Sequence, residues 1–398
     1  MYSLTQAEVA KKLDMSRATI SRWVDLAQEG KNNLQLETSN NKVRILDNPH
    51  NDIELKRLTK EGQKYKNYTP LKNTSIDPEF YNLFSDEEIV EIHNDLKYKL
   101  QVKHKYVYKQ PQFWDNFYKL GISPVSKANI ELLDATLQDV LYLFHQKDKI
   151  NLIDLGTGNG YPIKPSVEKL LKNKLLNSYI GIDISSKMLD LVDKNLQSWF
   201  PTIHTKTYTR DVETSRFGKI FLDHKSIVYE KNTGDASNLI LYMDGLCNLD
   251  DRVQGLKNIR SGMSDDDLLA ITFTLDTDSN KGQLNYIKDD ESTMRDGWYL
   301  QMLGVDIFDC QTSVEYDEKN NRKDKLYKLD KDYIVNFNIS NRDQSIKLNS
   351  GSKISTWRHY LLSVDQFQKE IAQSGLEMIN MKMDKSYSYV MALCRVKY

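Results

Sequence analysis

A glycine-rich turn directly after a short apolar segment constrains the fold of this 398-residue chain most strongly. The apolar segment covers residues 152–155, and the turn after it carries Gly156, Gly158 and Gly160. Glycine adopts backbone conformations that strain other residues, and it lets the main chain come close to a ligand. A second apolar segment ends in Asp183. A carboxylate at the end of a neighbouring strand can accept hydrogen bonds from both hydroxyls of an adenosine ribose.

The spacing of the glycines bears on the identity of the ligand. Dinucleotide-binding turns need their third glycine at the position that Tyr161 occupies here. An adenosine-containing ligand without phosphates is therefore favoured, and we expect S-adenosylmethionine (SAM). A tight turn in some other α/β protein is the alternative interpretation. The expected cofactor contacts are Asp154, Gly156, Thr157, Gly158, Gly160, Asp183, Asp211 and Asp244.

Strand and helix patterns alternate after the glycine turn, which predicts a parallel sheet covered by helices. Further strands are expected near residues 206–208, 239–243 and 268–275, with a helix over 186–198. The last two strands, 378–383 and 387–396, are joined so closely that they must be antiparallel. We therefore predict an α/β fold. A D-x-G-x-G-x-G turn after the first strand and an antiparallel hairpin at the end of a parallel sheet resemble the Rossmann-like fold of class I methyltransferases. At the third strand end, Asp211 either accepts from the adenine amino group or belongs to a solvated turn.

The first 67 residues predict a separate module of two short helices. Val9, Ala10 and Leu13, and then Ile20, Trp23 and Val24, recur at helical spacing. Thr5 and Ser16 are suited to cap the two helices, and Asp14 lies in the turn between them. The pattern resembles a helix-turn-helix, and residues 42–46 would form a wing.

The second of these helices would present polar side chains to a DNA groove. Residues 1–67 hold 12 Lys plus Arg and 9 Asp plus Glu, a net charge of +3. A helical hairpin for protein contact or dimerisation is the alternative, and a homodimer would match a two-fold DNA site. The DNA-binding candidates are Arg17, Thr19, Ser21 and Arg22.

The other domain boundaries are predicted from changes in composition along the chain and from turn-forming residues. Residues 68–104 predict a linker and a helix capped at Ser85. The resemblance to class I methyltransferases implies that 105–398 form the methyltransferase domain, with a substrate subdomain inserted at about 277–365. An aromatic cluster over 106–118 is either a lid over the cofactor or ordinary core packing. The net charge of −1 favours neither a nucleic-acid coat nor a membrane surface.

Compartment and metal content are also predicted. No run of 18 apolar residues and no signal-peptide pattern is present in the sequence, so we expect no membrane segment and a cytoplasmic protein. The three cysteines are scattered and the histidines form no ligand pair, so we expect reduced thiols and no metal site.

From about residue 105 onwards the chain resembles the histidine-specific N-methyltransferase family, which trimethylates histidine in ergothioneine synthesis and includes fungal relatives acting on tryptophan derivatives. The D-x-G-x-G-x-G turn from Asp154 resembles the first motif of class I methyltransferases. The other supporting segments are 113–129, 245–248 and 340–344 leading into 357–367. The resemblance implies that Asn248 and Trp357 contact the acceptor.

Two departures from the family pattern bear on the substrate. Ser123 and Pro124 replace the family's pair of tyrosines, and Trp357 and His359 fall where the family has the glutamate and serine that hold the imidazole. Removing a polar partner abolishes specificity that is built on it. The resemblance therefore implies an amino-acid-like or amine acceptor other than histidine.

Methyl transfer from a sulfonium is an in-line displacement, so the protein mainly aligns donor and acceptor and excludes water. An amine must lose its proton before it attacks, and one of His359, Tyr360 or Asp244 could assist by accepting a hydrogen bond. His359 and Tyr360 are the catalytic candidates, with a plain surface or packing role as the alternative for His359. Three functions stay open: a small-molecule N-methyltransferase fused to a DNA-binding module, a SAM-sensing regulator without catalysis, and a methyltransferase acting on nucleic acid or protein. The turn after Asp244 has no proline, which disfavours a flipped-base site.

Overall fold

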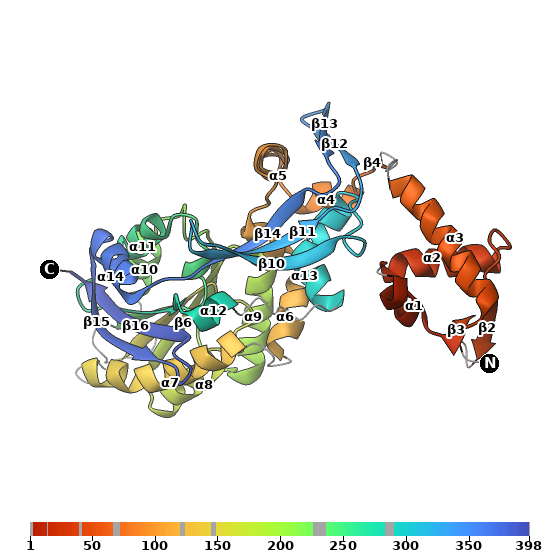
Figure 1. Cartoon of the computed structure of the whole chain (residues 1–398). Coiled ribbons are helices and arrows are strands. Elements are labelled where there is room, and N and C mark those ends of the chain that lie inside the picture. The colour runs from red at the N-terminus through yellow and green to blue at the C-terminus, as the bar shows by residue number, and fades with distance from the viewer. Residues whose placement is uncertain are drawn as a thin grey trace. The chain divides into compact units, whose positions relative to one another are not determined.

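The computed structural model describes residues 3–13, 15–39, 42–66, 72–119, 124–144, 149–225, 236–282 and 290–397. Asp14 and Ser123 lie outside the described residues. The chain forms two compact units (Figure 1). The first comprises Met1–Leu100, Trp298–Thr312 and Tyr327–Ile354, and the second comprises Gln101–Gly297, Ser313–Leu326 and Ser355–Tyr398.

The first unit begins with the predicted pair of helices. The elements are β1 (Ser3–Leu4), α1 (Gln6–Leu13), α2 (Arg17–Gln28), β2 (Leu36–Ser39), β3 (Lys42–Leu46) and α3 (Pro49–Lys66). The expected apolar face is buried in one cluster. Both predicted caps are present, since Glu8 N–H donates to Thr5 Oγ1 and Thr19 N–H donates to Ser16 Oγ. The strand predicted over residues 42–46 is β3, which pairs antiparallel with β1 and β2.

The rest of the first unit is built from segments far apart in the sequence. These are β4 (Lys72–Thr74), α4 (Pro78–Leu83), α5 (Asp86–Lys99), β12 (Tyr333–Ile339) and β13 (Arg342–Leu348). The strands form a sheet in the order β13-β12-β4. The predicted Ser85–Glu88 capping box begins α5. Residues 68–104, expected to be a linker and a helix, thus supply β4, α4 and α5.

A seven-stranded sheet forms the centre of the second unit. Its strands are β5 (Ile150–Leu155), β6 (Leu176–Asp183), β7 (Thr205–Thr209), β8 (Ser237–Tyr242), β9 (Leu268–Thr274), β15 (Leu376–Met383) and β16 (Tyr389–Val396). Their order is β15-β16-β9-β8-β5-β6-β7. Strands β5 to β9 are parallel, whereas β16 is antiparallel to both β9 and β15. This is the predicted class I methyltransferase sheet.

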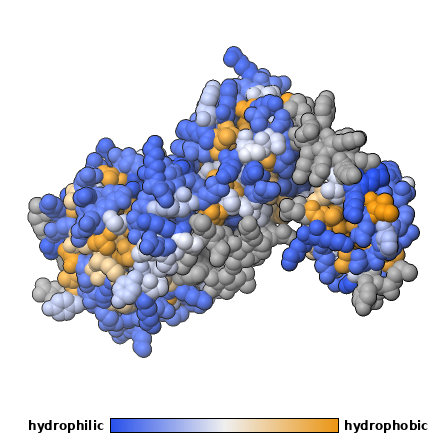
Figure 2. All heavy atoms as spheres, in the orientation of Figure 1, coloured by the Kyte–Doolittle hydropathy of each residue, from blue (hydrophilic) through white to orange (hydrophobic). Residues whose placement is uncertain are grey.

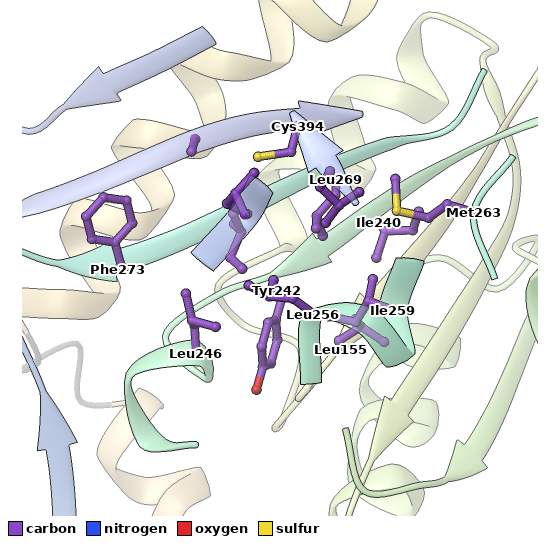
Figure 3. Packing of buried hydrophobic residues seen from close by; sticks show 14 of the residues in the cluster. Leu155, Ile240, Tyr242, Leu246, Leu256, Ile259, Met263, Leu269, Phe273 and Cys394 are labelled. Carbon is purple, nitrogen blue, oxygen red and sulfur yellow. The ribbon is translucent and has the colours of Figure 1, made fainter. Parts of the chain in front are cut away.

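Helices cover both faces of this sheet (Figure 1). One face packs against α7 (Pro124–Leu143), α8 (Lys164–Lys172) and α9 (Ser186–Trp199). The other packs against α10 (Gly218–Lys225), α11 (Arg252–Arg260) and α14 (Val364–Gln373). Every residue of β5, β6, β8 and β9 is buried. Figure 3 shows part of the hydrophobic core between the sheet and helices α10, α11 and α14. In this view the hydroxyl of Tyr242 points away from Ile240 and Leu269.

Several shorter elements flank the sheet. Before it come η1 (His104–Lys109) and α6 (Pro111–Lys119), and η2 (Leu246–Asn248) follows β8. Between β9 and α14 lie α12 (Asp278–Gly282), α13 (Asp290–Met302), β10 (Gln311–Asp317), β11 (Arg322–Lys328) and β14 (Lys353–Tyr360). The last three form a sheet in the order β10-β11-β14.

Surface and thiol features complete the description. Figure 2 shows a mainly hydrophilic face with separate apolar patches. Within the described ranges, no helix combines the length and apolarity that a membrane span requires. In the same ranges, His, Cys, Asp and Glu side chains form no group of three suited to bind a metal ion. Cys247, Cys310 and Cys394 are free thiols.

Candidate functional site

The glycine turn joins the carboxyl end of β5 to α8. Gly156, Gly158 and Gly160 have φ angles of +70°, +53° and +77°. This left-handed region costs side-chain-bearing residues energy and costs glycine little. A Cβ at Gly160 would also lie 2.7 Å from Cγ2 of Val192 on α9. The sequence pattern therefore reflects both backbone conformation and close packing.

Asp183 lies beside this turn, as the sequence predicted. Its carboxylate accepts hydrogen bonds from the N–H groups of Gly158 (3.2 Å) and Ser185 (2.9 Å). Burial raises the pKa of Asp183 to about 6, and the backbone N–H donors oppose this shift. Each carboxylate oxygen has a second lone pair that can accept from a ligand hydroxyl. The group is thus held in place and still able to bind a diol.

A tyrosine on the neighbouring strand β6 holds Asp154 in place. The hydroxyl of Tyr179 on β6 donates to Oδ2 of Asp154 at 2.8 Å, and lies 2.6 Å from Oγ1 of Thr157. Burial raises the pKa of Asp154 to about 7. Asp154 and Thr157 therefore stabilise the turn through the hydroxyl of Tyr179, and both side chains use hydrogen-bonding capacity in this contact. Tyr179 was not predicted, because a tyrosine in an apolar strand carries no sequence signal of such a contact.

A cavity opens beside the turn. Asn129 on α7 contributes an unexpected polar group, because its buried Oδ1 has no hydrogen-bond partner in the part of the chain that the structure describes. Buried polar groups without a partner are rare and are usually satisfied by a ligand or water. The lining consists of Tyr118, Ser126, Asn129, Asp154, Gly156, Thr157, Gly158, Pro162, Ile163, Met243 and Asp244.

The aromatic cluster over residues 106–118 lies partly in the core and partly at the cavity. Tyr106 and Trp114 are buried, as core packing requires. Tyr118 lines the cavity, and its Cε2 would lie 3.7 Å from a Cβ placed on Gly158. The ring of Tyr118 thus lies against the glycine turn, and a lid over the cofactor stays a prediction.

Asp244 follows β8 on the other side of the cavity. It has φ +61°, a conformation that is uncommon and strained for a residue other than glycine. Its N–H donates to Oγ1 of Thr272 (2.8 Å), and its carbonyl accepts from Nδ2 of Asn248 (3.3 Å). Desolvation raises the pKa of Asp244 to about 7. Backbone strain of this kind is typical of functional sites.

Asn248, Trp357 and His359 come together next to Asp244. Nδ1 of His359 lies 3.2 Å from Oδ1 of Asn248, and Nε2 lies 2.7 Å from Oγ1 of Thr274. The indole of Trp357 stacks on the His359 ring, with centroids 5.2 Å apart and an interplanar angle of 12°. Three residues that the resemblance placed at the acceptor are thus neighbours.

Two candidates lie elsewhere. Tyr360 projects from the other face of β14, where its hydroxyl lies 3.5 Å from Oδ1 of Asp250 and its ring is 4.7 Å from the guanidinium of Arg252. Asp211 accepts from the N–H of Glu213 at 2.9 Å, which is the turn geometry of the second interpretation. Contact of Asp211 with the adenine stays a prediction.

The predicted DNA-binding residues all lie on or near the exposed side of α2. Arg17 and Arg22 are exposed, and Ser21 is half-buried. Thr19 is half-buried, and its hydroxyl lies 2.9 Å from that of Ser16.

The comparisons with known proteins agree with the sheet and the glycine turn. The model of the family described as "Histidine-specific methyltransferase, SAM-dependent" matches residues 91–396. The chain belongs to this family. It is a SAM-dependent methyltransferase, and SAM is its cofactor.

Solved structures give weaker likenesses. One is a SAM-dependent methyltransferase from Clostridium acetobutylicum, at 10% identity over 72% of this chain and 99% of that chain, with a TM-score of 0.42. Another is magnesium protoporphyrin IX methyltransferase from Synechocystis with bound S-adenosylhomocysteine, at 11% identity over 73% and 97% of the two chains, with a TM-score of 0.40. No curated protein matches the methyltransferase in sequence.

Proposed function

We propose that this methyltransferase transfers the methyl group of SAM to an amine nitrogen of a small, amino-acid-like acceptor other than histidine. The observation that carries the proposal is the strained turn from Asp244 to Asn248, which joins the cofactor cavity to the Trp357–His359 pair. By the family resemblance, Trp357 and His359 occupy the positions where the family has the glutamate and serine that bind the imidazole of histidine. An indole cannot replace that carboxylate as an imidazole ligand.

The glycine turn, the cavity beside it and two nearby carboxylates suit the cofactor. Asp183 would hold the ribose hydroxyls, the glycine turn would allow close approach of the backbone, and the unsatisfied Oδ1 of Asn129 would accept from a donor on the cofactor. Asp211 would contact the adenine. When bound, SAM supplies an electrophilic methyl carbon whose bond to sulfur breaks as the bond to nitrogen forms, leaving S-adenosylhomocysteine.

The protein's own part in the reaction concerns the acceptor. An ammonium must lose a proton before its lone pair can attack. Asp244 is suited to accept this proton, because desolvation raises its pKa to about 7. Asn248 would orient the acceptor, and His359 would fix the amide of Asn248. Tyr118 and Trp357 would exclude water from the reacting atoms.

The direct test is formation of S-adenosylhomocysteine by the full chain with a panel of amines and amino acids. We expect turnover with at least one amine acceptor, and a rate at least tenfold lower for Asp244→Asn with cofactor affinity retained. Cofactor binding without turnover of any acceptor would favour the SAM-sensing regulator. Turnover of DNA or protein alone would favour the third function.

A second function, DNA binding by residues 1–67, is favoured by one specific feature of α2. Arg17 and Arg22 are exposed, and neither forms an ion pair in the described part of the chain. Unpaired guanidinium groups on one helix, followed by the β2–β3 hairpin, suit phosphate and base contacts.

An electrophoretic shift on genomic fragments tests this second function. We expect salt-sensitive binding by the wild type that Arg17→Ala/Arg22→Ala abolishes. The charge-matched control Lys31→Ala/Lys56→Ala should retain most of it. No shift by the wild type at low salt would exclude the function. Dimerisation stays a prediction, which gel filtration coupled to light scattering would check.

A further inference from the structure

The strand β11 places a lysine opposite the acceptor residues of β14. The N–H of Leu361 donates to the carbonyl of Asn321 (2.9 Å), which fixes these two residues as cross-strand partners. At the other end of the pair, the N–H of Leu329 donates to the carbonyl of Ser352, so the strands run antiparallel, with a register shift of one residue between the two ends. At the Asn321–Leu361 end, Arg322 lies opposite Tyr360 and Lys323 lies opposite His359. The guanidinium of Arg322 is 5.9 Å from the Tyr360 ring, in agreement with this register.

Alternation along the strand gives the face on which Lys323 lies. Successive side chains of a strand point to opposite faces, and directly opposed residues share a face. Lys323 therefore shares the face of His359 and Trp357, away from Arg322. Burial lowers the pKa of His359, and the nearby charge of Lys323 adds to this effect.

Within the described residues Lys323 forms no ion pair, unlike three basic neighbours on the same strands. On the same two strands, Arg322 pairs with Asp324 (2.9 Å), Lys325 with Asp296 (3.5 Å) and Arg358 with Asp250 (3.0 Å). Lys323 is half-buried, yet no carboxylate among the described residues lies within ion-pair distance of its Nζ. Desolvation lowers the pKa of Lys323, so keeping this charge costs the free protein energy.

We propose that Lys323 binds a carboxylate, or an equivalent anion, on the methyl acceptor. The proposal rests on the function proposed above and adds the residue that would bind the anionic group of an amino-acid-like acceptor. Cys247 and His359, the neighbours of Lys323, flank Asn248, so the counter-ion would arrive on the acceptor side of the site. A charge-assisted hydrogen bond to such an anion would offset part of the desolvation that Lys323 bears in the free protein.

The experiment compares acceptors that differ only in the carboxylate. The pairs are L-tryptophan and tryptamine, L-tyrosine and tyramine, L-lysine and cadaverine, and L-histidine and histamine. Initial rates of S-adenosylhomocysteine formation are measured for the wild type, Lys323→Met, Lys323→Arg and the control Lys328→Met, which removes an exposed charge from the same strand. Calorimetry with S-adenosylhomocysteine measures cofactor affinity for each variant.

We expect the wild type to prefer the carboxylate member of at least one pair by tenfold or more in kcat/KM. In Lys323→Met this preference should fall below about threefold through KM, whereas Lys323→Arg should restore part of it and Lys328→Met should match the wild type. Cofactor affinity should be unchanged throughout.

Each other outcome overturns the inference. Equal rates for amines and amino acids would contradict the inference about Lys323 and leave the proposed function intact. A preference that survives in Lys323→Met would assign the anion to another residue. Weaker cofactor binding in Lys323→Met, with acceptor preference retained, would show that Lys323 binds the cofactor's own carboxylate. No turnover of any of the eight compounds would contradict both the inference and the amine acceptor.

Discussion

The amide oxygen of Asn248 lies 3.2 Å from Nδ1 of His359. Nδ2 of Asn248 is used for the carbonyl of Asp244, so its Oδ1 accepts and Nδ1 of the ring carries the proton. Nε2 then accepts from the hydroxyl of Thr274. Burial lowers the pKa of His359 to about 3, which keeps the ring neutral. His359 therefore positions Asn248, and neither ring nitrogen is free to act as a base.

A change of His359 to phenylalanine tests this role. His359→Phe keeps a ring against Trp357 but leaves the buried oxygen of Asn248 unsatisfied, a loss of about 1–3 kcal/mol. We expect kcat/KM for the acceptor to fall about tenfold or more through KM, with unchanged affinity for S-adenosylhomocysteine. The matched control is Tyr360→Phe, on the other face of β14, which should retain activity. A rate limb that titrates near pH 6.5 in the wild type and disappears in His359→Phe would show a base instead.

Local features of the fold were predictable from the sequence. The turn from Gly156 to Gly160 and the acid at Asp183 are signalled by residue types that a conformation or a ligand requires. The caps at Thr5 and Ser16 depend on residues only three positions away. The sheet followed from alternating strands and helices, whose connections allow few topologies.

Contacts between distant strands were not predictable. The hydroxyl of Tyr179 reaches Asp154 only because β6 lies beside β5, and Lys323 faces His359 only through the register of β11 and β14. A shift of one residue would reverse the face of every side chain, and the sequence pattern does not fix that register. Tyr360 illustrates the consequence, since it is adjacent to His359 in the sequence and lies on the opposite face.

Cofactor affinity should depend on Asp183 and on pH. The ribose hydroxyls donate to the ionised carboxylate, whose pKa in the free protein is about 6. Affinity for S-adenosylhomocysteine should therefore be highest above pH 7 and weaken as the pH falls through 6, because binding then requires loss of a proton. Asp183→Ala should weaken binding by well over tenfold, about 1.5–3 kcal/mol for a charged hydrogen bond.

Calorimetry at pH 5.5 and 7.5 measures both effects. Asp183→Asn should lose the part of the pH dependence between these values that Asp183 causes. The exposed Asp190→Asn on α9 should behave as the wild type. Equal affinities in Asp183→Ala and the wild type would contradict the assignment.

The free energy of unfolding of the free protein should depend on pH through Asp154. Its pKa is raised from 3.8 to about 7 by burial, so the folded state binds this proton more tightly than the unfolded state. The resulting stabilisation is complete below pH 3.8 and is lost as the pH rises through 7, at about 1.4 kcal/mol per pKa unit.

Urea denaturation at pH 4.5 and 7.0 tests this linkage. Asp154→Asn can still accept from Tyr179 but does not titrate, so its free energy of unfolding should fall less over this interval than that of the wild type. Tyr179→Phe removes the donor and should destabilise the protein at both values. Parallel pH dependences for Asp154→Asn and the wild type would show that Asp154 is ionised throughout.

The turn after β8 should tolerate only glycine at position 245. Gly245 has an ordinary φ of −82°, so the constraint is steric. A Cβ there would overlap Cε2 of Tyr242, and the same ring atom would lie 4.0 Å from a Cβ on Gly156. The Tyr242 ring thus fills the space between the glycine turn and the turn from Asp244 to Asn248, at the edge of the core in Figure 3.

Gly245→Ala should displace this ring, destabilise the protein by about 1–3 kcal/mol and weaken cofactor binding. In Gly245→Ala/Tyr242→Leu the clash is gone, so the double variant should be more stable than the sum of the single effects by about 1 kcal/mol or more. Gly282→Ala, where a Cβ meets nothing within 4 Å, is the control and should change little. Additive free energies of unfolding would mean that residues 242 and 245 do not compete for the same space, and that the glycine is required for another reason.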